Sequence, residues 1–468
     1  MVKLIRLPGR RQRVAAEGGE RTLWIVNQYA VPRAMPGITR HVELADLLRE
    51  HGWATRIFAA AFHHTTATSI RPVSPVRASL DEIDGGIAFT WLWSSHYRRN
   101  GWKRYLNMAT YTTTLLTSGV HRPAPDAVVG SSPHLLAGLG AWILARRYKV
   151  PFVFEVRDMW PDMLVQLGLT SPLVIRPLAA LERFLYKRSD RIIALTDGIA
   201  DRIAAKGVSR DKIQVIPNAT LRPAPLDDTR RDAMRRQLGW NDRIVVVWAG
   251  SHNPMNGLDV VVEAARLLQD RDDILLAFIG DGSLKQDLKE QARGLPNVVF
   301  YDPVPKTEIG EWLRAADVGL IHSRRFEVFS GARPNKLFDY MAAGLAIVST
   351  VPGEAWRLIQ DAGAGISTVW EDPTALAAAI RSLAEAPEER RAMGRRGFEA
   401  VCQVHSREAT AAELAALLDD VCADRAVNSK FRDIERVTSF GTAPTGAARE
   451  ISPAGAIRRG DRNASAAD

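Results

Sequence analysis

The chain of 468 residues is too long for a single hydrophobic core, which predicts two domains plus tails, and its hydrophobic content of 46% is ample for both domains. Its formal net charge of +9 favours an anionic partner, although charge alone does not choose between nucleic acid, anionic lipid and a nucleotide sugar. The sequence has no run of about 18 apolar residues and no apolar signal core at its Arg-rich start, so we expect a cytoplasmic protein. Cys402 and Cys422 are expected on one helix, roughly 30 Å apart, which excludes a bridge between them and a cysteine metal site.

The first half of the chain alternates short apolar strand candidates with helical patterns, which is typical of an α/β domain. These strand candidates are residues 23–26, 55–59, 127–130, 152–155 and 191–195. A second series follows, with strand candidates at residues 244–249, 274–280, 298–301, 318–321 and 346–349. The sequence therefore predicts an α/β fold with two Rossmann-like domains in tandem.

The parts of the chain between and after the two series differ in composition. The join is rich in Pro and Asp, and an Ala-rich helix is expected over residues 407–421, before composition turns to Ala, Gly, Ser and Pro with scattered charge. We predict a basic flexible start at 1–20, an N-terminal domain at 21–218, a linker at 219–240, a C-terminal domain at 241–423 and a disordered tail at 424–468. Ligands of open α/β sheets bind beyond the carboxyl ends of the strands, so two facing domains would enclose a cleft.

Residues 333–344 combine cations, a carboxylate and very small residues on one expected helix. Lys336 and Asp339 share a helix face with Tyr340, and the small residues that follow would let a ligand approach the backbone. This pattern favours a phosphorylated, polyhydroxyl ligand, with Lys336 and Arg333 neutralising a diphosphate and Asp339 accepting ribose hydroxyls. The alternative is a solvated Lys–Asp pair, which contributes little to stability.

Two glycine turns follow strands of the second series. The loop 250–257, which contains Gly250, Ser251 and Asn256, leads to a helix N-terminus and would present free backbone N–H groups to phosphate. Gly280, after the next strand, has the same character. Packing alone is an equally good explanation of both turns, because tight turns commonly follow strands.

Several blocks of the sequence occur in the order seen in one enzyme family. In the C-terminal half they are residues 316–320, 331–344, 352–354 and 362–365. In the N-terminal half they are residues 36–41, 131–133 and above all Phe-Glu-Val-Arg-Asp-Met-Trp-Pro at 154–161. Together these blocks resemble the retaining glycosyltransferases of the GT-B fold, family 4, and within them the bacterial polysaccharide branch that includes the WbuB-type N-acetylfucosamine transferases. The resemblance runs from about residue 23 to residue 421.

The resemblance implies a nucleotide sugar on the C-terminal domain and an acceptor on the N-terminal one. Asp339 occupies the place of the family's second acid, which holds the ribose. Gly331 stands eight residues earlier, where the family has a glutamate, and the nearest acid is Glu327. The loop after residues 244–249 lacks the Arg and Lys that many relatives use on the diphosphate. The leaving group would then be stabilised by Lys336 and Arg333 with the backbone at Gly250, Gly353 and Glu354.

Glu155 and Asp158 follow an apolar strand at its carboxyl end, where catalytic groups of α/β proteins belong. Such a carboxylate could accept the proton that the acceptor hydroxyl loses. For Asp158 the alternative is a pair with Arg157 or a helix cap. The acceptor side further includes four residues, which are Gly37, Arg40, Ser132 and His134. For a lone histidine such as the last, a structural role is the common alternative.

The sequence offers no metal-binding motif. No Asp-x-Asp motif stands at a strand end, and His63-His64 lacks further ligands at metal-ligand spacing. We therefore expect no metal and no cofactor. Helix N-termini and cations would stabilise the departing diphosphate instead.

Residues 97–108 interleave cations with aromatic residues ahead of an apolar helical pattern. Such a stretch suits an anionic membrane interface, and the alternative is a helix that packs on its own domain. The expected partners are a UDP-sugar donor, a lipid-linked sugar acceptor, such as an undecaprenyl diphosphate sugar, and the inner face of the membrane, but no nucleic acid. Other functions stay open: a transferase with a soluble acceptor, an epimerase, a nucleic-acid binder suggested only by net charge, and a nucleotide binder without transfer.

Overall fold

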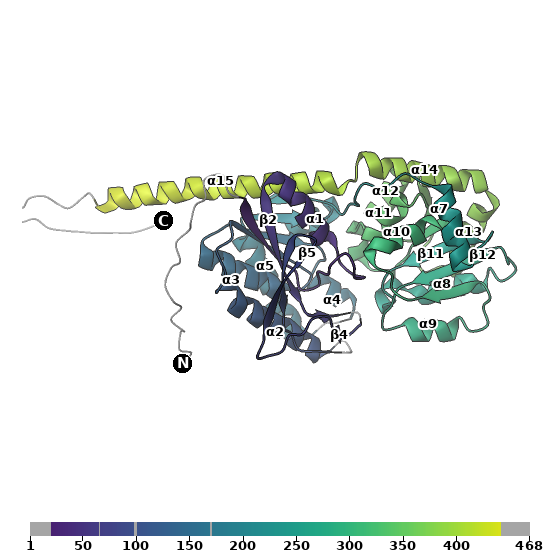
Figure 1. Ribbon diagram of the computed structural model, residues 1–468, viewed down its shortest axis with the longest axis horizontal. Coiled ribbons are helices and arrows are strands. Elements are labelled where there is room, and N and C mark those ends of the chain that lie inside the picture. The colour runs from purple at the N-terminus through teal and green to yellow at the C-terminus, as the bar shows by residue number, and fades with distance from the viewer. Residues whose placement is uncertain (1–19, 65, 98–100, 169–170, 441–468) are drawn as a thin grey trace, which may run out of the picture. The chain divides into compact units, whose positions relative to one another are not determined.

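The computed structural model describes residues 20–64, 66–97, 101–168 and 171–440, and its elements are drawn in Figure 1. Contacts group the chain into two units, Met1–Ala423 and Asp424–Asp468, and the description below concerns the first and the helix that continues from it into the second. This unit contains two large, mainly parallel sheets with hydrophobic cores on both faces. The predicted α/β fold with two Rossmann-like domains is therefore confirmed.

The N-terminal sheet has the strand order β10-β9-β8-β7-β1-β2-β6-β5, and all its pairs are parallel except β5 with β6. The strands are β1 (Arg21–Val26), β2 (Trp53–Ala60), β5 (Ser79–Asp84), β6 (Ile87–Leu92), β7 (Ala127–Ser131), β8 (Phe152–Val156), β9 (Arg191–Ala194) and β10 (Ile213–Val215). A separate pair joins β3 (Phe62–His63) and β4 (Thr68–Ser69). The central strands β7 and β8 are buried along their whole length, which is why they are continuous apolar runs in the sequence.

Helices cover both faces of this sheet. One core is completed by helices α2, α3, α5 and α6, and the other by α1 and the first turns of α15. The helices are α1 (Arg40–Leu48), α2 (Trp102–Gly119), α3 (Leu135–Tyr148), α4 (Asp162–Gln166), α5 (Pro172–Arg188), α6 (Asp197–Ala205) and α15 (Arg407–Phe440). The last of these crosses back from the C-terminal domain. Its residues Leu414 and Leu418 are buried in the N-terminal core, and Trp53 Nε1 donates to Asp419 Oδ1 at 3.0 Å.

The C-terminal sheet is parallel, with the strand order β13-β12-β11-β14-β15-β16. The strands are β11 (Ile244–Ala249), β12 (Ile274–Ile279), β13 (Val298–Tyr301), β14 (Val318–Ile321), β15 (Ala346–Ser349) and β16 (Gly365–Ser367). Helices α8, α9 and α13 complete one core, and α10, α11, α12 and α14 complete the other. The helices are α7 (Asp228–Leu238), α8 (Leu258–Arg266), α9 (Lys285–Gln291), α10 (Lys306–Arg314), α11 (Asn335–Ala342), α12 (Glu354–Asp361), α13 (Pro373–Glu385) and α14 (Pro387–Gln403).

The structure differs from the sequence-based expectations in several places. Half of the expected linker is helix α7, whose N-terminus is capped by Asp227. Helix α15 runs to Phe440, whereas disorder is expected from residue 424, because the intervening residues contain neither Pro nor Gly and sustain the helix. Residues 441–468 and 1–19 lie outside the described part. The prediction that one helix carries both Cys402 and Cys422 is wrong, because Cys402 lies on α14 and Cys422 on α15. Both are free cysteines.

Candidate functional site

Two glycine turns meet at the carboxyl edge of the C-terminal sheet. Gly250 follows β11 and Gly280 follows β12, and both have positive φ angles, 148° and 140°. A Cβ atom at Gly280 would lie 2.0 Å from the carbonyl oxygen of Gly250, so only glycine allows the two turns to approach this closely. The neighbouring loop is closed by Asn256, whose side-chain Nδ2 donates to the carbonyl of Ser251 at 2.5 Å. Ser251 Oγ in turn accepts from Asn253 Nδ2 at 3.3 Å.

Helix α11 brings a lysine to this edge. Lys336 Nζ lies 3.0 Å from the centre of the Trp248 ring. A Cβ atom at Gly250 would lie 3.1 Å from the same Nζ atom. Burial lowers the pKa of Lys336 well below its usual value, and the charge of Asp339 opposes this. Tyr340, one turn further along, accepts a hydrogen bond from the backbone N–H of Ala249 at 2.9 Å. Lys336 and Tyr340 therefore face the end of β11.

Asp339 has a different partner from the one the sequence suggests. Its Oδ1 lies 2.5 Å from Nζ of Lys306, the first residue of α10, and it makes no ion pair with Lys336 among the described residues. The solvated Lys336–Asp339 pair that the sequence left open is thus absent from the described part of the chain. Lys306 is a site residue that sequence reasoning missed, and no short-range pattern connects it to α11.

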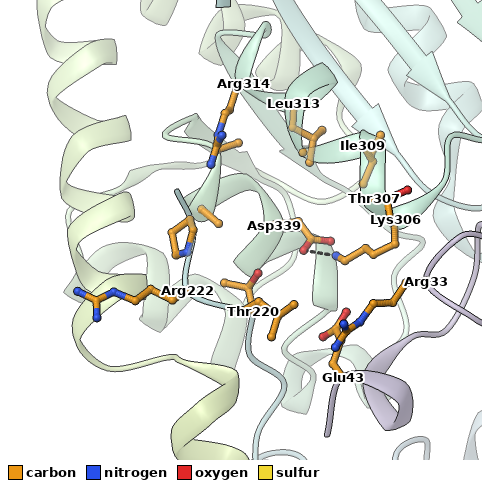
Figure 2. A pocket seen from close by; sticks show the side chains of 15 residues that line it. Arg33, Glu43, Thr220, Arg222, Lys306, Thr307, Ile309, Leu313, Arg314 and Asp339 are labelled. Carbon is orange, nitrogen blue, oxygen red and sulfur yellow. Dashed lines mark hydrogen bonds and ion pairs between the residues drawn. The ribbon is translucent and has the colours of Figure 1, made fainter. Parts of the chain in front are cut away.

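Asp339 also lines a pocket of about 270 Å³. Figure 2 shows Asp339 and Lys306 joined across it, with Arg33 and Glu43 of the N-terminal domain beside them. The pocket is lined by Arg33, Glu43, Thr220, Leu221, Arg222, Pro223, Lys306, Thr307, Ile309, Gly310, Leu313, Arg314, Asp339, Ala342 and Ala343. Both domains and the segment that joins them therefore contribute to one concave surface, with charged groups around an apolar interior.

A carboxylate links the two domains near the start of α11. Glu354 Oε1 accepts from the backbone N–H of Gly198 in α6 at 2.7 Å, and Oε2 lies 2.6 Å from Arg333 Nη2. Gly353, with φ of 85°, precedes it, and a Cβ atom there would lie 2.0 Å from the carbonyl oxygen of Ser330. Glu354 thus occupies the N-terminus of α6, where a negative charge is favourable.

The position of the family's missing acid lies at the same contact. Gly331 ends the short 3-10 helix η4 (Glu327–Gly331), and its carbonyl accepts a hydrogen bond from the hydroxyl of Thr196. A Cβ atom at Gly198 would be 2.9 Å from the Cα of Gly331. The Glu327 side chain is exposed, and its carbonyl accepts from Arg202 Nη2 at 3.0 Å. Segment η4 therefore docks on the N-terminal domain through its backbone.

Two buried histidines beside these turns were not expected from the sequence. His252 follows β11 and is 0% exposed, and burial lowers its pKa to about 4. His322 follows β14, its Nδ1 lies 2.8 Å from Thr350 Oγ1, and burial lowers its pKa to about 4 as well. Both imidazoles are therefore neutral near pH 7 and add no charge to this edge. A lone histidine after a strand carries no pattern that marks it in advance.

On the N-terminal side, Glu155 is buried in a network. Its Oε1 accepts from Arg40 Nε at 3.0 Å, and its Oε2 lies 2.6 Å from His41 Nε2 and 2.7 Å from Ser131 Oγ. His41 and Arg40 hold the pKa of Glu155 well below its usual value despite burial. Both carboxylate oxygens of Glu155 thus bond to side chains inside the domain, so the structure favours a structural role for this carboxylate.

Asp158, three residues later, is exposed. Its backbone N–H and that of Arg157 both donate to Ser132 Oγ, at 3.2 and 2.8 Å, so Ser132 fixes the loop through its side chain. Desolvation by the surrounding protein raises the pKa of Asp158, while Arg157 opposes the rise. Asp158 thus presents an exposed carboxylate just beyond the carboxyl end of β8.

The remaining acceptor-side residues have structural partners. Arg40 donates to the carbonyls of Ile216 and Pro217 at 3.0 and 2.7 Å and is 2% exposed, so it faces the interior and the chain that leaves the domain. Gly37 has φ of 147°, and a Cβ atom there would lie 2.8 Å from Val31. His134 is 2% exposed and caps α3 by accepting from the N–H of Ala137 at 3.2 Å. The assignment of these residues to the acceptor side stays a prediction, and the structure places Arg40 in the interior of the domain.

Within the described ranges, no three His, Cys, Asp or Glu side chains are grouped as metal ligands. The same ranges contain no helix that is both long and apolar enough to span a membrane.

Comparison with known proteins gives two adjoining family matches. The family described as "Glycosyl transferase 4-like domain" matches residues 37–219, and "Glycosyl transferases group 1" matches residues 243–386. The putative colanic acid biosynthesis glycosyl transferase WcaI of Escherichia coli K12 is 26% identical over 300 residues, which are 61% of this chain and 73% of that protein. A D-inositol 3-phosphate glycosyltransferase of Xylanimonas cellulosilytica is 26% identical over 294 residues, 59% of this chain and 68% of that protein.

Solved structures share the fold at low sequence identity. WaaG, a glycosyltransferase involved in lipopolysaccharide biosynthesis, aligns with a TM-score of 0.62 and 18% identity over 85% of this chain and 99% of its own. HepE of Anabaena, in complex with UDP-glucose, aligns with a TM-score of 0.62 and 14% identity over 85% of this chain and 99% of its own. The chain therefore carries, in order, the two domains of a glycosyltransferase with the GT-B fold, a glycosyl transferase 4-like domain and a glycosyl transferases group 1 domain.

Proposed function

We propose that this protein transfers a sugar from a nucleotide sugar to a lipid-linked glycan during synthesis of a cell-surface polysaccharide. The observation that carries the proposal is the position of Lys336, whose half-buried side chain places its amine over Trp248 and beside the turn at Gly250 without an ion-pair partner among the described residues. A lysine in this situation favours an anionic ligand, because the negative charge of the ligand would raise its lowered pKa again. WcaI is a putative enzyme of colanic acid biosynthesis and WaaG is involved in lipopolysaccharide biosynthesis, and both likenesses favour a role in polysaccharide synthesis.

The donor is proposed to lie along α11. Its diphosphate would meet Lys336, Arg333 and the backbone at the turns of Gly250 and Gly353, and its ribose hydroxyls would bond to Asp339 in exchange for Lys306. The pocket of Figure 2 would then accept the nucleoside, because it combines this carboxylate with an apolar interior. HepE is solved with UDP and with UDP-glucose, which favours uridine as the nucleoside. An N-acetyl sugar is proposed from the resemblance to the WbuB-type branch.

The transfer step exchanges one bond at the anomeric carbon. The acceptor hydroxyl oxygen bonds to this carbon as the bond from the carbon to the diphosphate oxygen breaks, with retention of configuration. The hydroxyl proton passes to the Asp158 carboxylate, and the electron pair of the broken bond leaves on the nucleoside diphosphate. Lys336 and Arg333 stabilise that developing negative charge. Glu155 is proposed to hold the loop of Asp158 in place, because its own oxygens are engaged.

The acceptor is proposed to reach the site from a membrane surface. At the start of α2, the exposed fractions are 70% for Trp102, 36% for Tyr105 and 43% for Leu106. Lys103, which lies between them in the sequence, is also exposed. Aromatic and aliphatic side chains interleaved with a cation are suited to the interface of an anionic bilayer. This supports a peripheral location on the inner face of the membrane. Residues 98–100 of the same segment lie outside the described part.

A soluble phosphorylated acceptor is the second candidate. Several relatives are D-inositol 3-phosphate glycosyltransferases, and they match over a similar share of this chain. The two candidates differ in where the product sugar is found.

The test is product analysis with the full-length protein, a panel of radiolabelled UDP-sugars and either extracted membrane lipids or inositol phosphate. We expect label in the lipid fraction with one UDP-sugar. Label on inositol phosphate would favour the second candidate. Interconversion of the free nucleotide sugars without transfer would refute both.

A further inference from the structure

Arg157 carries an unmatched guanidinium at the end of β8. Its Nε and Nη1 atoms are buried and have no hydrogen-bond partner among the described residues, and it makes no ion pair with them. Its backbone is nevertheless fixed, because its N–H donates to Ser132 Oγ at 2.8 Å. Buried donors without a partner are rare in folded proteins and cost free energy, so a charged group in this state needs an explanation.

The neighbouring charges do not supply one. Glu155 is bonded to Arg40 and His41, and Asp158 is exposed and forms no ion pair with Arg157. Arg157 is therefore a positive charge without an ion-pair partner among the described residues, in a loop whose backbone is held by Ser132. The residue as a whole is only half-buried, although its Nε and Nη1 atoms are covered.

The chemistry of this site selects an anion with several oxygen atoms. A guanidinium offers five N–H donors in one plane and binds phosphate oxygens in a fixed orientation. The loop after β11 contains no Arg or Lys, so the C-terminal domain would bring Lys336 and Arg333 to a diphosphate but no cation from this loop. Arg157 follows the strand that positions Asp158, which places the positive charge next to the proposed proton acceptor.

We infer that the Arg157 guanidinium is a phosphate-binding group that the N-terminal domain contributes to the cleft, where it binds a phosphate of a substrate diphosphate. This inference rests on the proposed function. Either diphosphate qualifies, that of the sugar donor or that of the lipid-linked acceptor, and the two sources are separable by experiment.

The test uses the full chain with Arg157→Gln and Arg157→Lys, and with Arg395→Gln as a matched control on an exposed part of α14. UDP and inorganic pyrophosphate are titrated calorimetrically into each protein in the absence of acceptor. We expect Arg157→Gln to weaken UDP binding by about tenfold or more, since a charge-assisted hydrogen bond is lost. Arg157→Lys should retain part of the affinity, and Arg395→Gln all of it. The unfolding temperature of Arg157→Gln should equal or exceed that of the unmodified protein, because no hydrogen bond within the protein is removed.

If UDP binding is unchanged while the KM for a diphosphate-bearing acceptor rises about tenfold, the phosphate belongs to the acceptor, which also supports the inference. A lower unfolding temperature with unchanged UDP affinity and unchanged KM values would show a structural arginine and overturn it. Equal behaviour of all variants would overturn it too. Binding of pyrophosphate that depends on Arg157, in a protein that transfers no sugar, would refute the proposed function but not this inference.

Discussion

The surroundings of Asp158 define what its carboxylate can do. The backbone N–H groups of Arg157 and Asp158 are fixed by Ser132, whereas the Asp158 side chain is exposed and has no hydrogen bond to a described residue. Glu155, on the same strand end, is held by Arg40 and His41. Two acids that stand three positions apart in the sequence thus occupy opposite environments, and it is for the exposed one that we propose proton exchange with a substrate.

Asp158→Asn is expected to lower kcat by about 10²- to 10⁴-fold, the usual contribution of a general base, with little effect on donor KM. A base acts in its deprotonated form, so activity falls as the pH drops through its pKa. Because desolvation raises the pKa of Asp158, the acid limb of the pH–rate profile should lie above the usual aspartate value of 3.8. The control is Asp361→Asn on an exposed part of α12. An unchanged kcat in Asp158→Asn would remove this residue from the proton transfer.

Lys336 leads to a second prediction at the scale of one residue. Burial lowers its pKa in the ligand-free protein, and a bound diphosphate raises it again by supplying negative charge. Donor binding should therefore take up protons, and affinity should fall as the pH rises through the ligand-free pKa. Calorimetry in buffers of different ionisation enthalpy measures this uptake. Lys336→Met should abolish it and weaken UDP binding by about tenfold or more, whereas the exposed Lys289→Met should do neither.

At the scale of elements, segment η4 and helix α6 form a contact between the domains that has room only for glycine at Gly198. A Cβ atom at Gly198 would meet the Cα of Gly331 at 2.9 Å, whereas a Cβ atom at Gly331 would have its nearest neighbour at 3.5 Å. The contact also includes the hydrogen bond from the N–H of Gly198 to Glu354 at 2.7 Å. The two glycines face each other but differ in how much space surrounds them.

Gly198→Ala is therefore expected to push η4 away and to cost about 1–3 kcal/mol, the usual penalty for overpacking. Gly331→Ala makes only ordinary contacts and serves as the matched control from the other side of the same contact. Chemical unfolding should show the difference, and limited proteolysis should show faster cleavage near η4 in Gly198→Ala alone. Equal stability of the two variants would mean that the domains do not rely on this contact.

The elements that the sequence predicted correctly are those with a local physical signature. Strands such as β8 and β15 are buried on both faces, so they appear as apolar runs. Strand β5 was missed because it is an edge strand of mixed exposure, with the sequence Ser-Leu-Asp-Glu-Ile-Asp. Strands β10 and β16 were missed because each has three residues. Strand β6, with the sequence Ile-Ala-Phe-Thr-Trp-Leu, was missed although it is mostly buried and apolar.

The candidate site was predictable only in part for a related reason. The sequence identified Lys336 and Asp339 from their helical spacing, but the partner of Asp339 is Lys306, which lies 33 positions away on another helix. The partners of Glu155 in α1 are 114 and 115 positions away. Contacts of this kind depend on how parallel strands bring their carboxyl ends together, and no local pattern records them.

At the scale of the molecule, α1 anchors both passages of the chain between the domains. Arg40 of α1 bonds to the carbonyls of Ile216 and Pro217, where the chain leaves the N-terminal domain. Glu43 of α1 accepts from Arg407 Nε at 3.0 Å, where the chain returns as α15. The two passages also bond to each other, because the N–H of Arg407 donates to the carbonyl of Thr220 at 2.8 Å. Motion of one domain relative to the other must therefore work against a helix fixed at two points.

The pair of Glu43 and Arg407 is buried, with side chains 2% and 4% exposed, so Arg407→Met leaves a carboxylate without its counter-ion. We expect the unfolding free energy at pH 7 to fall by about 3–5 kcal/mol. The pKa of Glu43 lies below its usual value because Arg407, Lys306 and Thr39 outweigh burial. The contribution of the ionised Glu43 carboxylate to stability is therefore present at pH values above its pKa in the unfolded chain. This contribution is lost as the pH falls through the pKa of Glu43 in the folded protein. In Arg407→Met burial prevails and raises the pKa of Glu43, so the loss of unfolding free energy should shrink as the pH is lowered from 8 to 5.

The double variant Glu43→Gln/Arg407→Met should recover part of the stability at pH 7, because the buried charge is gone. A loss that does not depend on pH and persists in the double variant would assign the effect to packing around α15 instead.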